Sequence, residues 1–140
     1  MTSVLVVDDE QSIRFTLQAF LADHCDEIHT APDSRTALDL LKRHHIDVAV
    51  CDIVLPDIDG LELLQSIRDV APQVKVIMIT GQPTVNTTAE ALRAGAFDFL
   101  LKPIRREGFL QSVANALRFK ALEDERRLLE KESLRYQDQL

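Results

Sequence analysis

The sequence has few of the residues that mark several classes of protein. Its 140 residues include two cysteines, four glycines and no tryptophan, and no apolar run is long enough to span a membrane. Cys25 and Cys51 lack the spacing of a metal site, so we expect buried free thiols in a reducing cytoplasm. The net charge of −7 disfavours non-specific nucleic-acid binding. The amino terminus has no basic region with a cleavage site, which argues against a signal peptide.

Five short apolar runs alternate with segments of helical spacing. We expect the runs to be strands, at residues 4–7, 27–31, 46–51, 74–79 and 96–101. Between them, apolar residues recur every three or four positions, as in amphipathic helices. The predicted helices cover residues 12–22, 33–43, 61–70 and 84–94, and a last helix begins near residue 106. This alternation predicts an α/β fold with a doubly wound parallel sheet and right-handed crossovers.

Polar side chains stand where four of these runs end. They are Asp8, Asp9, Asp52, Thr80 and Lys102. Ligands of an open parallel sheet bind beyond the carboxyl ends of its strands, so we expect these side chains to converge in one shallow site. Crowded carboxylates need a cation, and their oxygens suit Mg²⁺. Magnesium beside a carboxylate, a hydroxyl and an ammonium is typical of sites that handle a phosphoryl group.

Four motifs around these residues resemble those of the receiver domains of two-component response regulators. The motifs are residues 6–10 (VVDDE), 52–60 (DIVLPDIDG), 79–81 (ITG) and 99–103 (FLLKP). An aspartate pair alone is common, but four motifs in the right order and at the right intervals are highly specific. The resemblance covers roughly residues 2–120 and implies a flavodoxin-like, five-stranded sheet of order 2-1-3-4-5, with strands one and three flanking the switch point.

The resemblance implies a phosphoacceptor and a metal site. Asp52 is the expected nucleophile, whose carboxylate would become an acyl phosphate. Asp8 and Asp9 are expected to bind Mg²⁺ together with Asp52 and the backbone carbonyl of Val54. On the residues alone, Asp52 could instead cap a helix or turn, but it belongs to a set.

The resemblance also implies a switch around the new phosphoryl group. Lys102 is expected to contact the phosphoryl oxygens, and the peptide bond before Pro103 is often cis in the family. Thr80 is expected to bind a phosphoryl oxygen and to move when that group arrives. Phe99 would then turn inward, although a static core phenylalanine is an open alternative.

These roles predict a signalling switch and not an enzyme with an external substrate. A histidine kinase would supply the phosphoryl group, and the receiver would catalyse only its own phosphorylation and dephosphorylation. One alternative is a phosphohydrolase of the haloacid-dehalogenase type, which also uses a nucleophilic aspartate. Such enzymes need an acid two residues later, where this chain has Val54. The other alternative is a module that binds a partner without phosphorylation, against which the complete five-residue set argues.

We expect a receiver domain at residues 1–119 and a helical extension at residues 120–140. The extension is charged, lacks glycine and proline, and keeps a 3-4 spacing through Phe119, Leu122, Arg126, Leu129, Ser133, Tyr136 and Leu140. Five of these seven residues are apolar, which predicts a parallel coiled coil and a homodimer, with a solvated linker as the alternative. The pattern is unbroken at Leu140, so we expect a longer regulator with an output domain.

Overall fold

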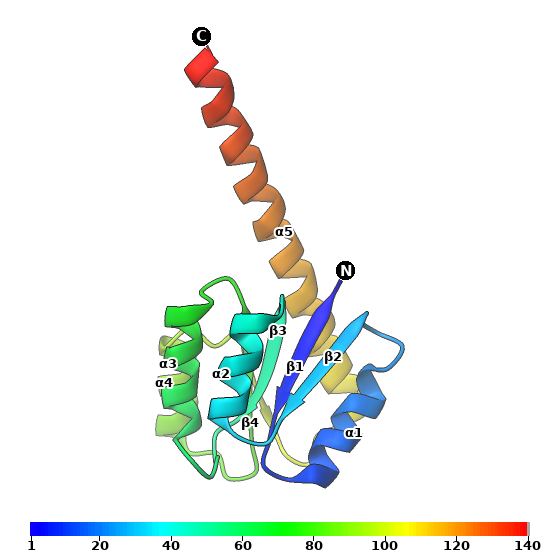
Figure 1. Cartoon of the computed structure of the whole chain (residues 1–140). Coiled ribbons are helices and arrows are strands. Elements are labelled where there is room, and N and C mark those ends of the chain that lie inside the picture. Colours follow the sequence, from blue (N-terminus) through cyan, green and yellow to red (C-terminus); the bar gives the residue numbers. More distant parts are fainter. Residues whose placement is uncertain (140) are drawn as a thin grey trace.

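Strands and helices alternate through the computed structural model, which describes residues 1–139 (Figure 1). The strands are β1 (Ser3–Val7), β2 (Glu27–Ala31), β3 (Val48–Asp52), β4 (Lys75–Thr80) and β5 (Asp98–Leu101). The helices are α1 (Gln11–Leu21), α2 (Ser34–Arg43), α3 (Gly60–Val70), α4 (Val85–Arg93) and α5 (Arg106–Gln139). Every predicted element is present, and its ends differ from the prediction by no more than two residues.

The five strands form one parallel sheet of order β2-β1-β3-β4-β5, as the resemblance implies. β1 and β3 are neighbours, and Val7 pairs with Cys51 at their carboxyl ends. From β1 the chain continues to β2 in one direction across the sheet, and from β3 it continues to β4 in the opposite direction. The switch point of the sheet therefore lies between β1 and β3. Asp8 and Asp52 therefore emerge side by side.

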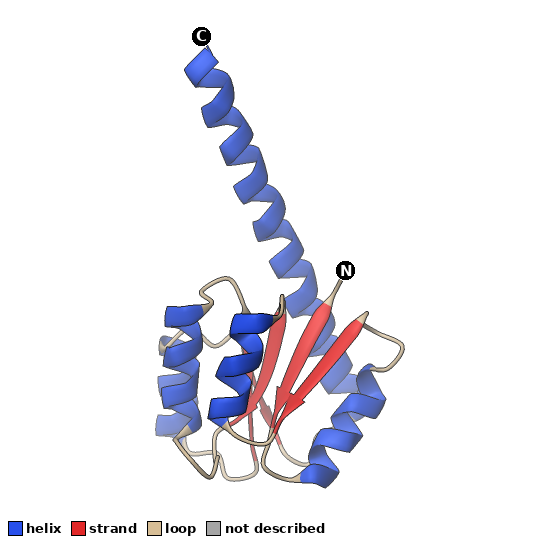
Figure 2. Cartoon of the chain, viewed as in Figure 1, coloured by secondary structure: helices blue, strands red, loops and turns tan. Residues whose placement is uncertain are grey.

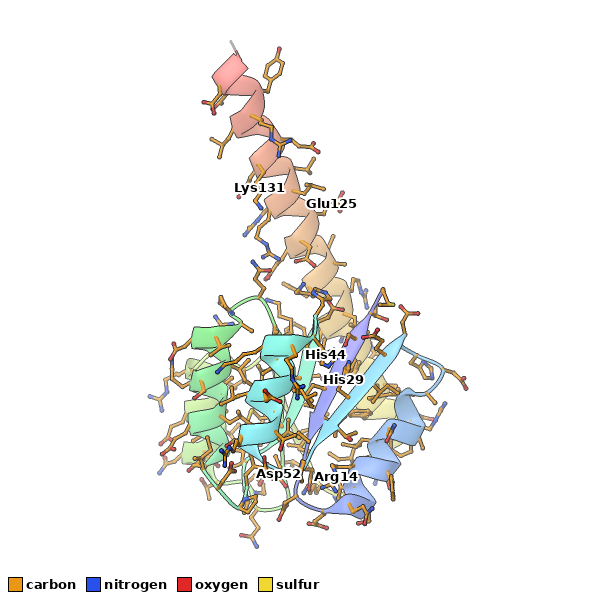
Figure 3. All side chains as sticks on the ribbon, viewed as in Figure 1. Arg14, His29, His44, Asp52, Glu125 and Lys131 are labelled. Atoms are coloured by element: carbon orange, nitrogen blue, oxygen red, sulfur yellow. The ribbon has the colours of Figure 1, made fainter. Side chains whose placement is uncertain are left out.

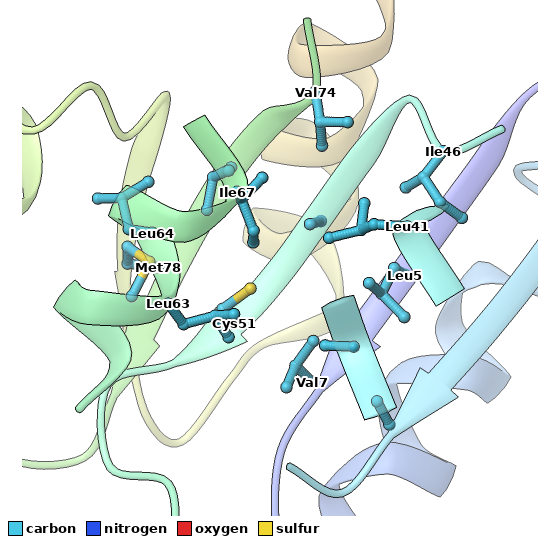
Figure 4. Close-up of a cluster of buried hydrophobic side chains, with 14 of the residues drawn as sticks. Leu5, Val7, Leu41, Ile46, Cys51, Leu63, Leu64, Ile67, Val74 and Met78 are labelled. Carbon is cyan, nitrogen blue, oxygen red and sulfur yellow. The ribbon is translucent and has the colours of Figure 1, made fainter. Parts of the chain in front are cut away.

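Helices cover both faces of the sheet, with α2, α3 and α4 on one face and α1 and the first half of α5 on the other (Figure 2). Successive β1 residues alternate between two hydrophobic clusters. Leu5 packs with the first cluster, which Figure 4 shows under α2 and α3, and Val6 packs with the second. Burial on both faces explains why the strands read as continuous apolar runs.

Local capping residues fix where several helices begin and end. The Asp33 carboxylate accepts a hydrogen bond from the backbone N–H of Thr36, 2.8 Å away, at the start of α2. Thr84 forms a reciprocal capping box with Thr87 at the start of α4. Gly95 follows α4 with a φ of 99°, a left-handed conformation that favours glycine and allows the chain to turn into β5.

α5 continues for 34 residues, far beyond the edge of the sheet. It leaves the body at the end where the amino terminus lies, opposite to the carboxyl ends of the strands (Figure 1). The helix passes the predicted domain boundary between residues 119 and 120 without a break, and Leu140 lies outside the described residues. Over residues 1–139, none of the helices combines the length and apolar character needed to cross a membrane.

Candidate functional site

The carboxyl edge of the sheet brings the predicted residues together. Asp52 and Thr80 are the last residues of β3 and β4, Asp8 follows β1, and Lys102 follows β5. Figure 3 places Asp52 at the end of the body opposite to the projecting helix. A pocket of about 260 Å³ at this edge is lined by Asp9, Glu10, Asp52, Val54, Thr80, Gly81, Gln82 and Lys102. The pocket thus joins residues from all four motifs.

The ammonium of Lys102 bridges the acidic residues. Its Nζ lies 2.7 Å from Oδ2 of Asp52 and 3.0 Å from Oδ2 of Asp8, and Oε1 of Glu10 is 4.0 Å away. Burial alone would lower the pKa of Lys102, but the hydrogen bonds and charges of Asp52 and Asp8 outweigh it and raise that pKa. Lys102 therefore stays charged and holds the two carboxylates together.

Asp8 lies behind the pocket and is fully buried. Its Oδ1 accepts a hydrogen bond from the backbone N–H of Glu10 at 2.9 Å, whereas Oδ2 has no hydrogen bond of good geometry despite the nearby Lys102. Burial raises the pKa of Asp8, and the charge of Asp52 adds to this rise, while the Glu10 amide and Lys102 oppose it. A second cation would relieve this crowding.

The residues present fit Mg²⁺. Carboxylate oxygens of Asp8, Asp9 and Glu10 all lie within 4.8 Å of one another. Asp9 and Glu10 are exposed, so water has access to the cluster, and Mg²⁺ usually keeps several waters beside one or two carboxylates. Oδ2 of Asp8, a member of this cluster, is buried without a hydrogen-bond partner, as expected for an oxygen that a metal ion would satisfy.

Thr80 and Val54 line the pocket together with Asp52. The hydroxyl of Thr80 is buried and accepts a hydrogen bond from the backbone N–H of Gln82 at 3.2 Å. The backbone N–H of Lys102 donates to the Thr80 carbonyl at 2.8 Å, which ties the end of β4 to the residue after β5. The Val54 N–H donates to Oδ1 of Asp52 at 3.0 Å, so the loop after β3 folds against the acceptor carboxylate.

Phe99 lies outside the pocket. It pairs with Met78 between β5 and β4, is half-buried, and packs against the cluster under α2, α3 and α4. This position is that of a core residue at the β4–β5 end of the sheet, and its movement toward Thr80 stays a prediction.

The loop from β3 to α3 is held by two contacts that sequence reasoning did not identify. A Cβ on Gly60 would lie 2.4 Å from the Asp52 carbonyl oxygen, so only glycine allows this close return of the chain. Asp57 accepts hydrogen bonds from the Ser34 hydroxyl at 2.5 Å and from the Ser34 and Arg35 amides at 3.2 Å. The Ser34 hydroxyl is the main cause that lowers the pKa of Asp57 to about 2.

Arg14 is a further residue that the sequence did not single out. Its Nη1 donates to the backbone carbonyl of Asp8 at 2.6 Å, and Figure 3 shows Arg14 at the same end of the body as Asp52. The contact ties α1 to the turn that carries Asp8 and Asp9. Only the helical spacing of α1, which sets Arg14 one turn after Glu10, could have pointed to it.

Two further expectations agree with the structure. The Lys102–Pro103 peptide bond is cis, as the resemblance implies. Cys25 and Cys51 are free thiols, as expected; Cys51 is buried as predicted, whereas Cys25 is only half-buried. Burial raises the pKa of the Cys51 thiol to about 12, so this cysteine is an unreactive core residue.

Fold and edge chemistry together define a class of protein. A doubly wound 2-1-3-4-5 sheet with acids, a hydroxyl and a lysine at its switch-point edge is the arrangement of CheY-like signalling domains, which act as switches. The family model of the response regulator receiver domain matches residues 4–114. The chain belongs to this family.

Curated relatives are longer proteins. The chain is 37% identical over 126 residues to the regulatory protein AtoC of Escherichia coli, and 40% identical over 121 residues to the response regulator protein PilR of Pseudomonas aeruginosa. These matches cover 90% and 86% of the chain but 27% of each relative. Among solved structures, the beryllofluoride-activated NtrC4 receiver domain dimer matches with a TM-score of 0.81 and 38% identity, over 86% of this chain and 99% of that one.

Proposed function

We propose that Asp52 accepts a phosphoryl group from a histidine kinase and that the receiver then switches an output. The observation that carries this proposal is the contact between Lys102 and Asp52, in a pocket that also contains Thr80 and the exposed Asp9. Asp52 is only 4% exposed, but it lines this pocket, through which a phosphoryl donor can approach, and a cation and a hydroxyl line the same pocket for the incoming charge.

The reaction needs only residues that line the pocket, together with Asp8 directly behind it. An oxygen of Asp52 attacks phosphorus, the bond between phosphorus and the kinase histidine nitrogen breaks, and the bond electrons leave with that nitrogen. Mg²⁺, bound by Asp8, Asp9, Asp52 and the Val54 carbonyl, would neutralise the phosphoryl oxygens. Lys102 already stands within hydrogen-bonding distance of Asp52, so its ammonium can pass from the carboxylate to the new phosphoryl group.

The switch would follow from the change in charge at the end of β4. A phosphoryl group adds negative charge and strong acceptors, which compete for the Thr80 hydroxyl. Thr80 now accepts a hydrogen bond from Gln82, so its movement would alter the loop into α4. Phe99, on the neighbouring strand, would follow. Such a two-state element biased by local charge is a common switching device.

The phosphohydrolase alternative requires an acid two residues after the nucleophile, and this chain does not have one there. Two residues after the nucleophile stands Val54, whose side chain is 63% exposed and offers no proton. We therefore propose that catalysis is limited to phosphorylation and dephosphorylation of this chain itself. The complete polar set also argues against a module that works without phosphorylation.

The partners follow from the same proposal. A histidine kinase would act in the cytoplasm, where the free thiols of this chain would stay reduced. An output domain would follow the helix, because the chain spans 27% of the length of AtoC and of PilR. A homodimer would form through the projecting part of α5, whose Leu122 and Leu129 are more than half exposed.

Phosphorylation with a small donor tests the acceptor. After incubation with acetyl phosphate and Mg²⁺, mass spectrometry should show one added phosphoryl group that is labile to base. Asp52→Asn should abolish the addition, while Asp69→Asn, an exposed aspartate on α3, should leave it unchanged. Full labelling of Asp52→Asn would remove Asp52 from its role.

A further inference from the structure

A cluster of ion pairs joins α5 to the sheet at the edge opposite to the pocket. Lys120 is 3% exposed, an unusual burial for a lysine. Its Nζ lies 3.4 Å from Oδ1 of Asp47 and 2.6 Å from Oδ2 of Asp124. A second pair, 2.6 Å long, connects Lys75 with Glu123. None of these residues takes part in the phosphoryl site.

Asp47 anchors the cluster in the body. Its Oδ2 accepts a hydrogen bond from the Ser3 amide at 3.0 Å, and Nε2 of His45 lies 2.9 Å from Oδ1. Its backbone N–H donates to the Ser3 carbonyl, and its own carbonyl accepts from the Lys75 amide. Asp47 therefore connects the amino ends of β1, β3 and β4, and Lys120 connects those three strands to the helix.

The charged residues occupy one side of α5. At 100° per residue, positions 120, 123, 124 and 127 share a face, and Arg127 pairs with both Glu123 and Asp124. The apolar residues Leu122, Leu129 and Tyr136 recur every seven positions on the opposite face and are all more than half exposed. The charged face of α5 contacts the body, so the apolar stripe of Leu122, Leu129 and Tyr136 points away from the body.

We propose that these residues form a helix clamp, made of Asp47, Lys75, Lys120, Glu123 and Asp124, that sets the direction and rotation of α5 where it leaves the receiver. Lys120 is its positioning residue. The inference rests on the proposed dimerising role of the extension, because the clamp presents the stripe of Leu122, Leu129 and Tyr136 to a second copy of this chain.

Ion pairs suit this task better than apolar contacts would. A buried pair costs desolvation and is weak as a source of stability, but it accepts few geometries, and its best-attested use is to fix register. The last fully buried apolar residue of α5 is Ala116. Leu117 still packs against the same cluster, and Phe119 makes an edge contact with Phe97 at 5.6 Å between ring centres. From Lys120 onward, ion pairs join the helix to the body, between Lys120 and Asp47 and between Glu123 and Lys75.

Distance measurements between spin labels test the clamp. Labels at Gln65→Cys on α3 and Glu132→Cys on the projecting helix report its direction, in a Cys25→Ser background; Cys51 is buried and will not react. Labelled chain is diluted with unlabelled chain, so that only distances within one chain are measured. The parent should give one narrow distance. Lys120→Met and Glu123→Gln should lose it and give a broad distribution.

The control is Arg126→Gln, which removes a charge of the same helix outside the clamp and should keep the narrow distance. If Lys120→Met fails to fold, the test of the clamp rests on Glu123→Gln alone, because the Lys75–Glu123 pair is partly exposed and its loss should leave the fold intact. A narrow parental distance in a folded variant would overturn the clamp. Labelling of Asp52 by acetyl phosphate is measured in the same samples: its absence in the parent would refute the proposed function without altering the distance result.

Discussion

Nζ of Lys102 lies 2.7 Å from Oδ2 of Asp52, although 50 positions separate the two residues in the chain. The two meet because β3 and β5 end at the same edge, on either side of β4. Lys102 also reaches Asp8, so one ammonium serves two carboxylates. Any group that binds to Asp52 must therefore compete for, or share, the same cation.

Removal of this ammonium should separate phosphorylation from switching. We expect Lys102→Ala to fold and to accept a phosphoryl group on Asp52, but to lose the conformational response, because no cation then links the new group to β5. NMR chemical shifts of Thr80 and Phe99 with and without acetyl phosphate are the measurement. Lys42→Ala, an exposed lysine on α2, is the control. Parental shift changes in Lys102→Ala would make the lysine a bystander.

Magnesium should stabilise the fold through the acidic cluster. Bound Mg²⁺ would relieve the repulsion between Asp8, Asp9 and Asp52, and a ligand at ten times its dissociation constant adds about 1.4 kcal/mol to the free energy of unfolding. Thermal unfolding with increasing MgCl₂ measures this gain, and Asp9→Ala should lose most of it. Glu62→Ala, an exposed acid in the first turn of α3, should retain it. A full gain in an Asp8→Ala, Asp9→Ala double variant would place the site elsewhere.

Asp57 should make stability depend on pH in the acid range. Its pKa in the folded protein is about 2, below the ordinary 3.8, so the folded state favours the ionised carboxylate. Its contribution is therefore complete above pH 3.8 and is lost as the pH falls toward 2. Asp57→Asn should lower the free energy of unfolding near pH 7 by about 1 kcal/mol, the usual size for a helix-start contact, since solvent screens the exposed carboxylate.

Urea unfolding of the parent and Asp57→Asn, at neutral pH and at successively lower pH, measures that contribution. The difference between the two proteins should shrink below pH 3.8. Asp23→Asn, an exposed aspartate after α1, should match the parent at every pH. A difference that stays constant down to pH 2 would exclude the carboxylate as its source.

Much of this fold could be predicted because its signals are local. The apolar run of β1 and the capping residue of α2 are readable in a few consecutive residues, and a strict alternation of elements leaves few topologies. The site followed for the same reason: Asp52, Thr80 and Lys102 stand at strand ends, which a parallel sheet brings to one edge.

The remaining contacts could not be predicted because they join polar and charged residues that are ordinary in sequence. Lys120 and Asp47 are 73 positions apart, and Asp57 and Ser34 are 23 apart. Each of these side chains could equally well lie on a solvent-exposed face. Whether it is buried, and with which residue it pairs, can be seen only once the strands and helices are placed. For Phe99 the residue type itself is ambiguous, because a phenylalanine suits both a static core position and a side chain that moves on phosphorylation.

The extension should dimerise through its apolar stripe. We expect Leu122→Asp with Leu129→Asp to weaken the dimer of the 140-residue chain by at least about tenfold, or 1.4 kcal/mol, because charges replace leucines in the seam. Sedimentation over a range of concentrations is the measurement. Leu128→Asp with Leu134→Asp changes two equally exposed leucines outside the stripe and should have a smaller effect. Unchanged dimerisation in the first variant would assign any dimer to the receiver surface.

The unbroken helix after Lys120 can amplify small movements of the receiver, because the helix beyond its exit is longer than the distance from the pocket to that exit. Its strands of five residues span about 17 Å between the pocket and the helix exit. The 20 residues from 120 to 139 extend about 30 Å, so a tilt of about 10° at the exit would carry the tip about 5 Å. Rearrangements too small to expose new surface near Asp52 can thus become displacements the size of a side chain at the far end.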